Sequence, residues 1–304
     1  MNPRRRALIE LHICVVLWGF TAILGKLITL SATALVWWRM LLVTLALACV
    51  PKVWRALREI PPRLIAVFAG IGCVVALHWV TFYASVKLAN ASVAATCMGL
   101  APAVTALIEP AIAGTRFERH NLLLGFIVIP GVALVVGGIP DSMHGGFWVG
   151  VLSAGLAAVF IALNKRFLGE NDALTVTAVE LGAGWLLLSV VGPFMAPPGQ
   201  FLVLPGFQDG AWLLVLAVFC TLIPYALSLA TLRHLSAFTA QLAINLEPLY
   251  AITIAVLFLG EARDLDDPFY LGVVILLAAV FGHGWLQMRS SRLTQRLTDE
   301  RPSV

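Results

Sequence analysis

The chain of 304 residues is 60% hydrophobic and only 12% charged, whereas soluble domains are about 45–50% apolar and about 25% charged. A water-exposed globule could not bury this much apolar surface, so the composition excludes a soluble domain and favours a protein surrounded by lipid. The net charge of +4 does not indicate nucleic-acid binding, because the basic residues lie between hydrophobic segments rather than in one patch.

Apolar runs bounded by proline, glycine and charge clusters predict ten membrane-spanning helices. A bilayer core about 30 Å thick needs roughly 20 residues per helix, so ten helices leave no room for a sizeable soluble domain. The five cysteines all lie inside these runs without metal-ligand spacing, so neither a disulfide framework nor a metal site is predicted. The predicted helices lie near residues 9–30, 35–51, 63–86, 91–113, 121–138, 147–167, 174–195, 210–232, 237–259 and 269–288.

Charges in the turns predict how the chain lies in the membrane. Arg4, Arg5 and Arg6 precede a first run that lacks a small-x-small cleavage site, so this run is expected to remain as an uncleaved span. With the N-terminus inside, the even-numbered turns and the C-terminal tail carry most of the lysines and arginines, which is the positive-inside pattern. Both termini are therefore predicted to be cytoplasmic.

An internal repeat relates the segment around Pro102 to the segment around Pro248, with a shift of about 146 residues. Gly114 then falls on Gly260. Because five spans, an odd number, lie in each half, the second copy enters the membrane from the other side, and we expect one all-α domain of two inverted five-helix repeats. The expected bounds of the first repeat, the second repeat and the cytoplasmic tail are 7–140, 146–288 and 289–304.

Several small motifs are spread over the two halves of the chain, and only the runs around Pro102 and Pro248 are copies of each other. The motifs are Trp18-Gly19, Lys26, Arg39, Pro102 within 91–114, and Pro248 within 237–261, which ends in Leu259-Gly260-Glu261. Together they resemble the ten-helix EamA group of the drug/metabolite transporter superfamily, although Gly114 is followed by Thr115 rather than by glutamate. The resemblance covers nearly the whole chain. It implies a two-repeat bundle that usually exports amino acids, other metabolites or toxic organic compounds.

Charged side chains inside a span cost about 2.5–3.5 kcal/mol on insertion scales, so each one is a functional candidate. The candidates for a coupling or structural role are Lys26, Arg39, Glu109, Glu180 and Glu247. Arg39 and Glu180 occupy comparable helices of the two halves, and the alternative to function is that they pair with each other or cap main-chain carbonyls. Lys26 is expected to reach the outer headgroups, and Glu109 to lie near solvent at the cytoplasmic end of its span.

The third predicted span carries aromatic and titratable side chains at three- and four-residue spacing. His78, Trp79, Phe82 and Tyr83 therefore lie on adjoining helical faces and are predicted to line a cavity suited to a zwitterionic or aromatic solute. The alternative is that Trp79 and Phe82 face lipid or pack between helices. His78 is a candidate carrier of a coupling proton, or else bonds a neighbouring helix. Tyr83→Ala or His78→Ala is expected to weaken transport while leaving expression near normal.

The ninth predicted span adds neutral polar groups. Gln241 and Asn245 are one turn apart and share a face, where they could hold a polar substrate. Glu247 lies on another face, before Pro248, whose ring frees a main-chain carbonyl. Further substrate-binding candidates in other spans are Trp18, Asn164 and Tyr225.

These features favour a secondary transporter over two other classes. A membrane enzyme acting on lipid would need reactive polar clusters in its loops, and a non-transporting scaffold would not need an inverted repeat. The sequence holds no phosphate loop, nucleophile elbow or histidine pair at metal spacing, so no cofactor or metal is expected. We expect a monomer or weak homodimer that exports an amino acid or similar solute across the bacterial inner membrane by alternating access. Substrate identity, direction and coupling to protons stay open.

Overall fold

The computed structural model describes residues 3–113, 120–235, 240, 243–244, 246–279 and 281–282, and within these every regular element is helical. Six helices are long and apolar enough to cross a bilayer, or seven if the bent pair α2 and α3 forms one span. Three shorter apolar helices occupy Ile127–Gly137, Glu247–Leu259 and Asp267–Ala279. An all-helical membrane protein, as the composition predicts, is confirmed; the count of ten spans stays a prediction.

The first half of the chain begins its helices with recognisable caps. Ser31 and Asn90 each accept a hydrogen bond from the third residue after them, and prolines occupy the first turns of α3 and α4. The axes of α2 and α3 meet at 87°, a bend that the sequence analysis did not predict. The helices are α1 Pro3–Leu27, α2 Ala32–Ala48, α3 Pro51–Leu57, α4 Pro62–Leu88, α5 Ala91–Met98, α6 Ala101–Ala113 and α7 His120–Gly137.

The second half contains two π-helical segments within its spans. One of them, η2, joins α10 to α11 just before Pro224, where the proline ring cannot donate a main-chain hydrogen bond. The elements are η1 Asp141–Met143, α8 His144–Phe167, α9 Ala173–Met195, α10 Phe207–Ala217, η2 Val218–Leu222, α11 Ile223–Thr231, α13 Glu247–Ile254, η3 Ala255–Leu259, η4 Glu261–Asp264 and the helix Asp267–Ala279.

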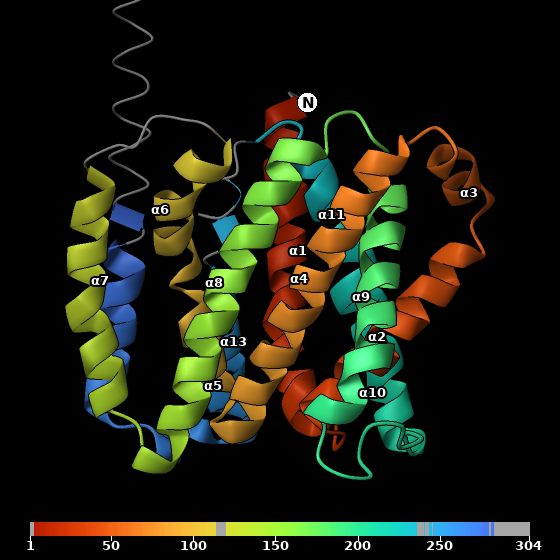
Figure 1. Cartoon of the computed structure of the whole chain (residues 1–304). Coiled ribbons are helices and arrows are strands. Elements are labelled where there is room, and N and C mark those ends of the chain that lie inside the picture. Colours follow the sequence, from red (N-terminus) through yellow and green to blue (C-terminus); the bar gives the residue numbers. More distant parts are fainter. Residues whose placement is uncertain are drawn as a thin grey trace, which may run out of the picture.

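Helices from the two halves pack against each other along their length. Figure 1 shows α4 running beside α8 and α9, so the third span of the first half contacts two helices of the second. At the crossing of α4 and α9, a Cβ at Gly72 would lie 2.0 Å from the main-chain oxygen of Glu180. Small residues thus allow the backbones to approach closely, as is common in membrane bundles.

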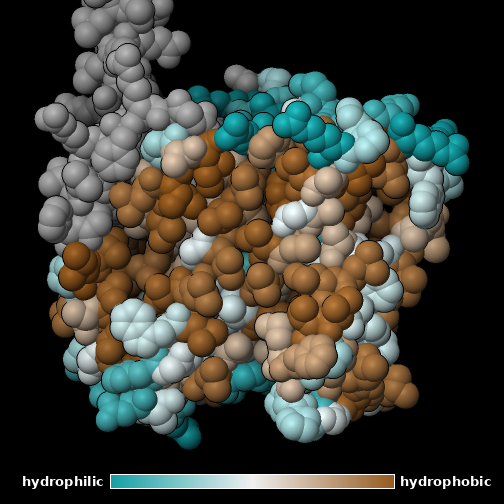
Figure 2. All heavy atoms as spheres, viewed as in Figure 1, coloured by the Kyte–Doolittle hydropathy of each residue, from teal (hydrophilic) through white to brown (hydrophobic). Residues whose placement is uncertain are grey.

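The outer surface is apolar around its middle. Figure 2 shows hydrophobic side chains in a broad band between two hydrophilic ends. Large side chains such as Phe194 and Phe207 are 90% and 97% exposed, which would be costly in water and is expected where lipid is the solvent.

Candidate substrate cavity

A cavity lies among helices of both halves. Its empty volume is about 910 Å³, a figure that includes space open to its surroundings. The lining comes from α1, α2, α4, α5, α8, α11, α13 and the segment before α13. The lining residues are Leu11, Trp18, Thr21, Arg39, His78, Trp79, Phe82, Met98, Ala157, Phe160, Ile161, Asn164, Tyr225, Ser228, Leu229, Leu232, Ala240, Ile244 and Glu247.

Most of the candidate residues meet in or directly behind this cavity. The candidates among the lining residues are Trp18, Arg39, His78, Trp79, Phe82, Asn164, Tyr225 and Glu247. Tyr83 and Glu180 are fully buried behind the wall, where they bond to Arg39 and Tyr225 respectively.

The remaining candidates lie elsewhere. Lys26 is exposed near the end of α1, and Glu109 is half-buried near the end of α6; neither contributes to the lining. Gln241 and Asn245 lie outside the described residues.

Arg39 is the principal charged group of the wall and is only 2% exposed. Its guanidinium donates from Nε to Thr221 Oγ1 at 2.5 Å, from Nη1 to the Tyr83 hydroxyl at 2.7 Å and from Nη2 to the Cys220 main-chain oxygen at 3.0 Å. Two of these acceptors belong to the π-helical segment η2, where the altered main-chain bonding leaves the Cys220 carbonyl available. Arg39 does not pair with Glu180, which was one of the alternatives left open by the sequence.

Aromatic rings connect the two buried polar groups. The Arg39 guanidinium carbon lies 3.9 Å from the centroid of the Trp79 ring, a cation–π contact. Trp79 in turn meets Tyr225 edge to face at 6.2 Å between centroids. The Tyr225 hydroxyl donates to Glu180 Oε2 at 2.5 Å. One continuous set of contacts therefore joins α2, α4, α11 and α9.

His78 is held against α8 rather than left free. Its Nδ1 lies 3.0 Å from the Ser153 main-chain oxygen, and the Ser153 hydroxyl donates to the His78 main-chain oxygen at 2.9 Å. The ring also packs near Phe82 and Phe160. A bond from Nδ1–H to a carbonyl leaves Nε2 as the acceptor of a neutral imidazole. These contacts with α8 are those of the helix-bonding alternative, and a role of His78 as carrier of a coupling proton stays a prediction.

Two other wall residues have buried polar atoms without partners in the described part of the chain. Thr21 Oγ1 makes no hydrogen bond there, and the side-chain amide of Asn164 lies beside Glu180 and Tyr225 but within strict hydrogen-bond geometry of neither. Thr21 is 7% exposed and Asn164 is 0% exposed. Unpartnered buried polar atoms are costly in a protein interior, so the position of Thr21 favours a polar guest.

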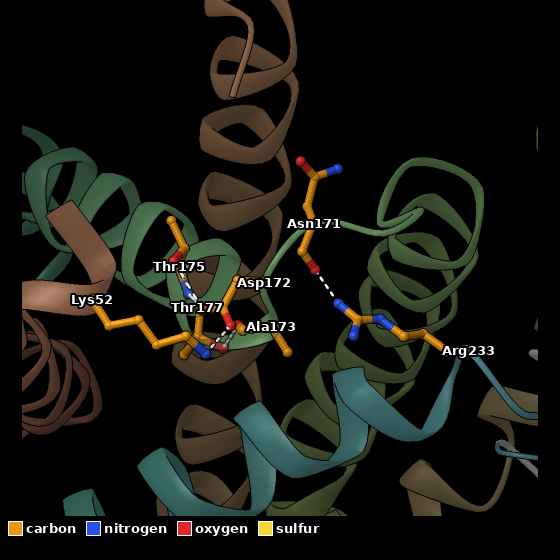
Figure 3. Close-up of polar contacts among 7 residues, drawn as sticks. All are labelled: Lys52, Asn171, Asp172, Ala173, Thr175, Thr177 and Arg233. Atoms are coloured by element: carbon orange, nitrogen blue, oxygen red, sulfur yellow. Dashed lines mark hydrogen bonds and ion pairs between the residues drawn. The ribbon is translucent and has the colours of Figure 1, made fainter. Parts of the chain in front are cut away.

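Polar contacts hold helices together at the end of the bundle that carries α3. Lys52 Nζ lies 2.5 Å from Asp172, the N-cap of α9, which also accepts from the main chain and hydroxyl of Thr175 (Figure 3). Burial acts to raise the pKa of Asp172, but the bonds from Lys52 and Thr175 outweigh it and hold the pKa below its ordinary value. Arg233 donates to the main-chain oxygen of Asn171.

A second set of contacts lies at the opposite end. Glu261 is 3% exposed and accepts from the main-chain N–H of Ala91 at 3.0 Å, and from the N–H and hydroxyl of Ser92 at 2.9 and 2.7 Å. A carboxylate at the first turn of a helix satisfies amides that have no partner inside the helix. Nearby, Asp209 accepts from the main chain and hydroxyl of Thr29.

Sequence reasoning missed several residues of the site. Thr221 and Ser153 position Arg39 and His78, and Thr21 and Phe160 line the wall. Thr221 lies three residues before Pro224, and a proline inside an apolar run is a signal for irregular main chain near it. The partner of the Thr221 hydroxyl, Arg39, lies 182 positions earlier, and this pairing depends on helix packing and has no local signal.

The fold and the cavity define a helical, multi-pass membrane protein with a mainly apolar cavity between its halves that carries a few polar and charged side chains. The EamA-like transporter family matches the chain at residues 6–137 and again at 144–284, and the chain belongs to this family. The two matched stretches confirm the internal repeat and the resemblance drawn from the motifs. The family is one of transporters rather than enzymes, which argues against the lipid-modifying alternative.

Individual proteins are also similar to this chain. An uncharacterized transporter of Bacillus subtilis (strain 168), YxxF, is 27% identical over 221 residues. That match spans 69% of this chain and 66% of the relative, slightly less than two thirds of its length. A solved crystal structure that is 17% identical covers 94% of this chain and 98% of its own, with a TM-score of 0.63, and shows a shared fold.

Proposed function

We propose that this protein is a secondary transporter that moves a small organic metabolite, an amino acid or similar solute, by alternating access. The observation that carries the proposal is the enclosed cavity, whose wall combines helices of both family repeats with aromatic rings and opposite charges. Sites of this kind lie near the midplane of inverted-repeat transporters, where rocking of one half against the other exposes them to each side in turn.

We propose ten membrane spans in two inverted repeats at 7–140 and 146–288, with both termini and the tail at 289–304 in the cytoplasm. Each of the three shorter apolar helices coincides with part of a predicted span. Lysines and arginines concentrated in the even-numbered turns support the orientation. Labelling of single introduced cysteines in intact cells, one per loop, tests both proposals, since adjacent loops must alternate in accessibility.

We place the protein in the bacterial inner membrane as a monomer or weak homodimer that works in the direction of export. The bacterial source of the relative supports the location in a bacterial membrane, and the family resemblance supports export. Coupling to protons is an option of this mechanism, since His78, Glu180 and Glu247 are titratable groups in or behind the wall.

Counterflow in proteoliposomes tests the function directly. Vesicles loaded with an unlabelled amino acid are diluted into the same labelled compound, and a panel of amino acids and organic cations is compared with and without a pH gradient. Selective accumulation supports transport, and its response to the gradient decides coupling. No selective accumulation across the panel, by monodisperse protein, would contradict the proposal.

Two tryptophans provide a matched pair of variants. Trp79→Phe keeps a ring in the wall but reduces its area, and is expected to lower counterflow about 3- to 10-fold, because part of a buried aromatic contact with the solute is lost. Trp148 is 58% exposed on the outer surface, so the same change in Trp148→Phe is expected to leave transport at the wild-type rate. Equal loss in both variants would assign the effect to folding instead of the cavity.

A further inference from the structure

Arg39 carries a charge that its protein partners do not neutralise. All three of its hydrogen-bond acceptors are uncharged: a hydroxyl of Thr221, the phenol of Tyr83 and the main-chain oxygen of Cys220. In the described part of the chain no carboxylate forms an ion pair with it. A cationic side chain deep in a membrane span with only neutral partners is costly, and such residues are usually functional.

The geometry leaves part of the guanidinium available to the cavity. Arginine has five N–H donors, and the three bonds above use three of them. One face of the group lies on the Trp79 ring at 3.9 Å, which fixes its plane. Arg39 belongs to the cavity wall, so an incoming acceptor can reach it. The arrangement is a rigid cationic fork fixed by uncharged neighbours, which suits a planar, two-oxygen anion.

The cavity wall also carries an acidic residue that does not form an ion pair with Arg39. Glu247 lines the same cavity and interacts with Arg39 through the electrostatic field without forming an ion pair. A guanidinium and a separate carboxyl group on the lining of one cavity provide different positions for the anionic and the cationic group of one solute. Thr21 adds a buried hydroxyl that has no partner among the described residues and therefore favours a polar guest.

We propose that Arg39 is the anchor for a carboxylate group of the transported solute, so that the substrate class is carboxylate-bearing organic compounds, zwitterionic amino acids among them. This inference rests on the proposed function for its physiological meaning, but it makes a claim about binding that can be measured without transport. Tyr83, Thr221 and the Cys220 carbonyl position the anchor, and Trp79 orients it. A single guanidinium beside an acidic residue suits one carboxylate better than a dianion.

The test uses two pairs of probes that differ only at the anionic group. They are 3-phenylpropionate with 3-phenylpropanamide, and L-phenylalanine with L-phenylalaninamide, whose rings suit the aromatic wall. Binding to the purified full-length protein in detergent is measured by the concentration dependence of the melting temperature. We expect each carboxylate to bind about 10-fold or more tightly than its amide, since hydrogen bonds between charged groups are the strong ones.

Three variants separate anchoring from structural support. Arg39→Gln is expected to bring the preference for carboxylate over amide close to 1. Arg39→Lys keeps a charge without the fork and is expected to keep part of the preference. Thr221→Val removes one positioning bond but leaves the charge, and is expected to weaken binding of acid and amide alike while keeping most of the preference.

The outcomes distinguish this inference from the proposed function. Equal binding of acids and amides by the wild type overturns the anchor, even if both are transported, and so does a preference that survives in Arg39→Gln. If Arg39→Gln does not fold, the anchor is tested by two measurements. They are the preference of the wild type for carboxylate over amide and the reduction of that preference in Arg39→Lys. Failure of both acids to bind at millimolar concentration also overturns the anchor. A carboxylate preference without counterflow supports the anchor and contradicts the transport proposal.

Discussion

Gly72→Ala is expected to destabilise the bundle at the crossing of α4 and α9. A Cβ at this position would lie 2.0 Å from the main-chain oxygen of Glu180 and 2.6 Å from its Cα. Ordinary van der Waals contact begins near 3.4 Å, so the helices must separate locally by about 1.4 Å. Both sides are backbone, so no side-chain rotation can relieve the contact. Overpacking typically costs about 1–3 kcal/mol, and this site should lie at the upper end.

The assay is the melting temperature of the detergent-purified protein, with Gly70→Ala as the control. Gly70 lies two residues earlier on the same helix, is exposed, and would have no atom within 4 Å of an added Cβ. Alanine favours helix over glycine, so the control should match or slightly exceed the wild type. Gly72→Ala should melt several degrees lower. Equal melting temperatures for the two variants would refute the close crossing.

Three further substitutions test single contacts by the same melting assay. Tyr225→Phe removes the donor to Glu180 and should cost about 1–3 kcal/mol, because a buried carboxyl group then loses its hydrogen bond; an unchanged melting temperature would contradict this. Glu261→Gln should lower stability by about 1 kcal/mol or more, because an amide cannot accept at both positions from the first turn of α5; equal stability would show that one oxygen suffices. The pKa of Asp172 is lowered on folding, so its bond to Lys52 stabilises above the unfolded pKa near 3.8 and is lost as pH falls through the lower folded value. Wild type should therefore lose more stability than Asp172→Asn below about pH 4, and parallel curves would contradict the assignment.

Local patterns predicted the spans and one wall of the cavity. The spacing of His78, Trp79 and Phe82 placed their side chains on neighbouring faces of one helix, and all three line the cavity. Their common placement follows from helical periodicity, which acts over a single turn and needs no knowledge of other helices, whereas their contact with a substrate stays a prediction. Arg39 was identified as a candidate for a similar reason, since a charge inside an apolar run is expensive wherever the helix packs.

Contacts between distant segments could not be predicted in this way. Arg39 and Glu180 were considered as partners because they occupy comparable helices, yet the structure joins Arg39 to Thr221 and Glu180 to Tyr225. Each of these bonds depends on the rotation of two helices about their axes, which is set by small residues at crossings such as Gly72. The sequence marks such residues but does not say which helix each one faces.

The sequence-based expectation that Tyr83→Ala leaves expression near normal needs revision. Tyr83 is fully buried, and its ring occupies the space beside Gly25, where an added Cβ would lie 2.4 Å from Cε1. Removing a buried ring typically costs about 3–5 kcal/mol, so Tyr83→Ala should reduce the amount of folded protein and confound any transport assay.

Tyr83→Phe is the better test of the same residue. It keeps the ring and removes only the oxygen that accepts from Arg39 Nη1 at 2.7 Å, while the bonds to Thr221 and Cys220 keep the guanidinium near its place. Expression should stay near normal. The KM for a transported carboxylate should rise about 3- to 10-fold, because a less constrained guanidinium holds a carboxylate less well through two parallel hydrogen bonds. Wild-type KM and kcat in a well-expressed Tyr83→Phe protein would show that this hydrogen bond has no part in transport.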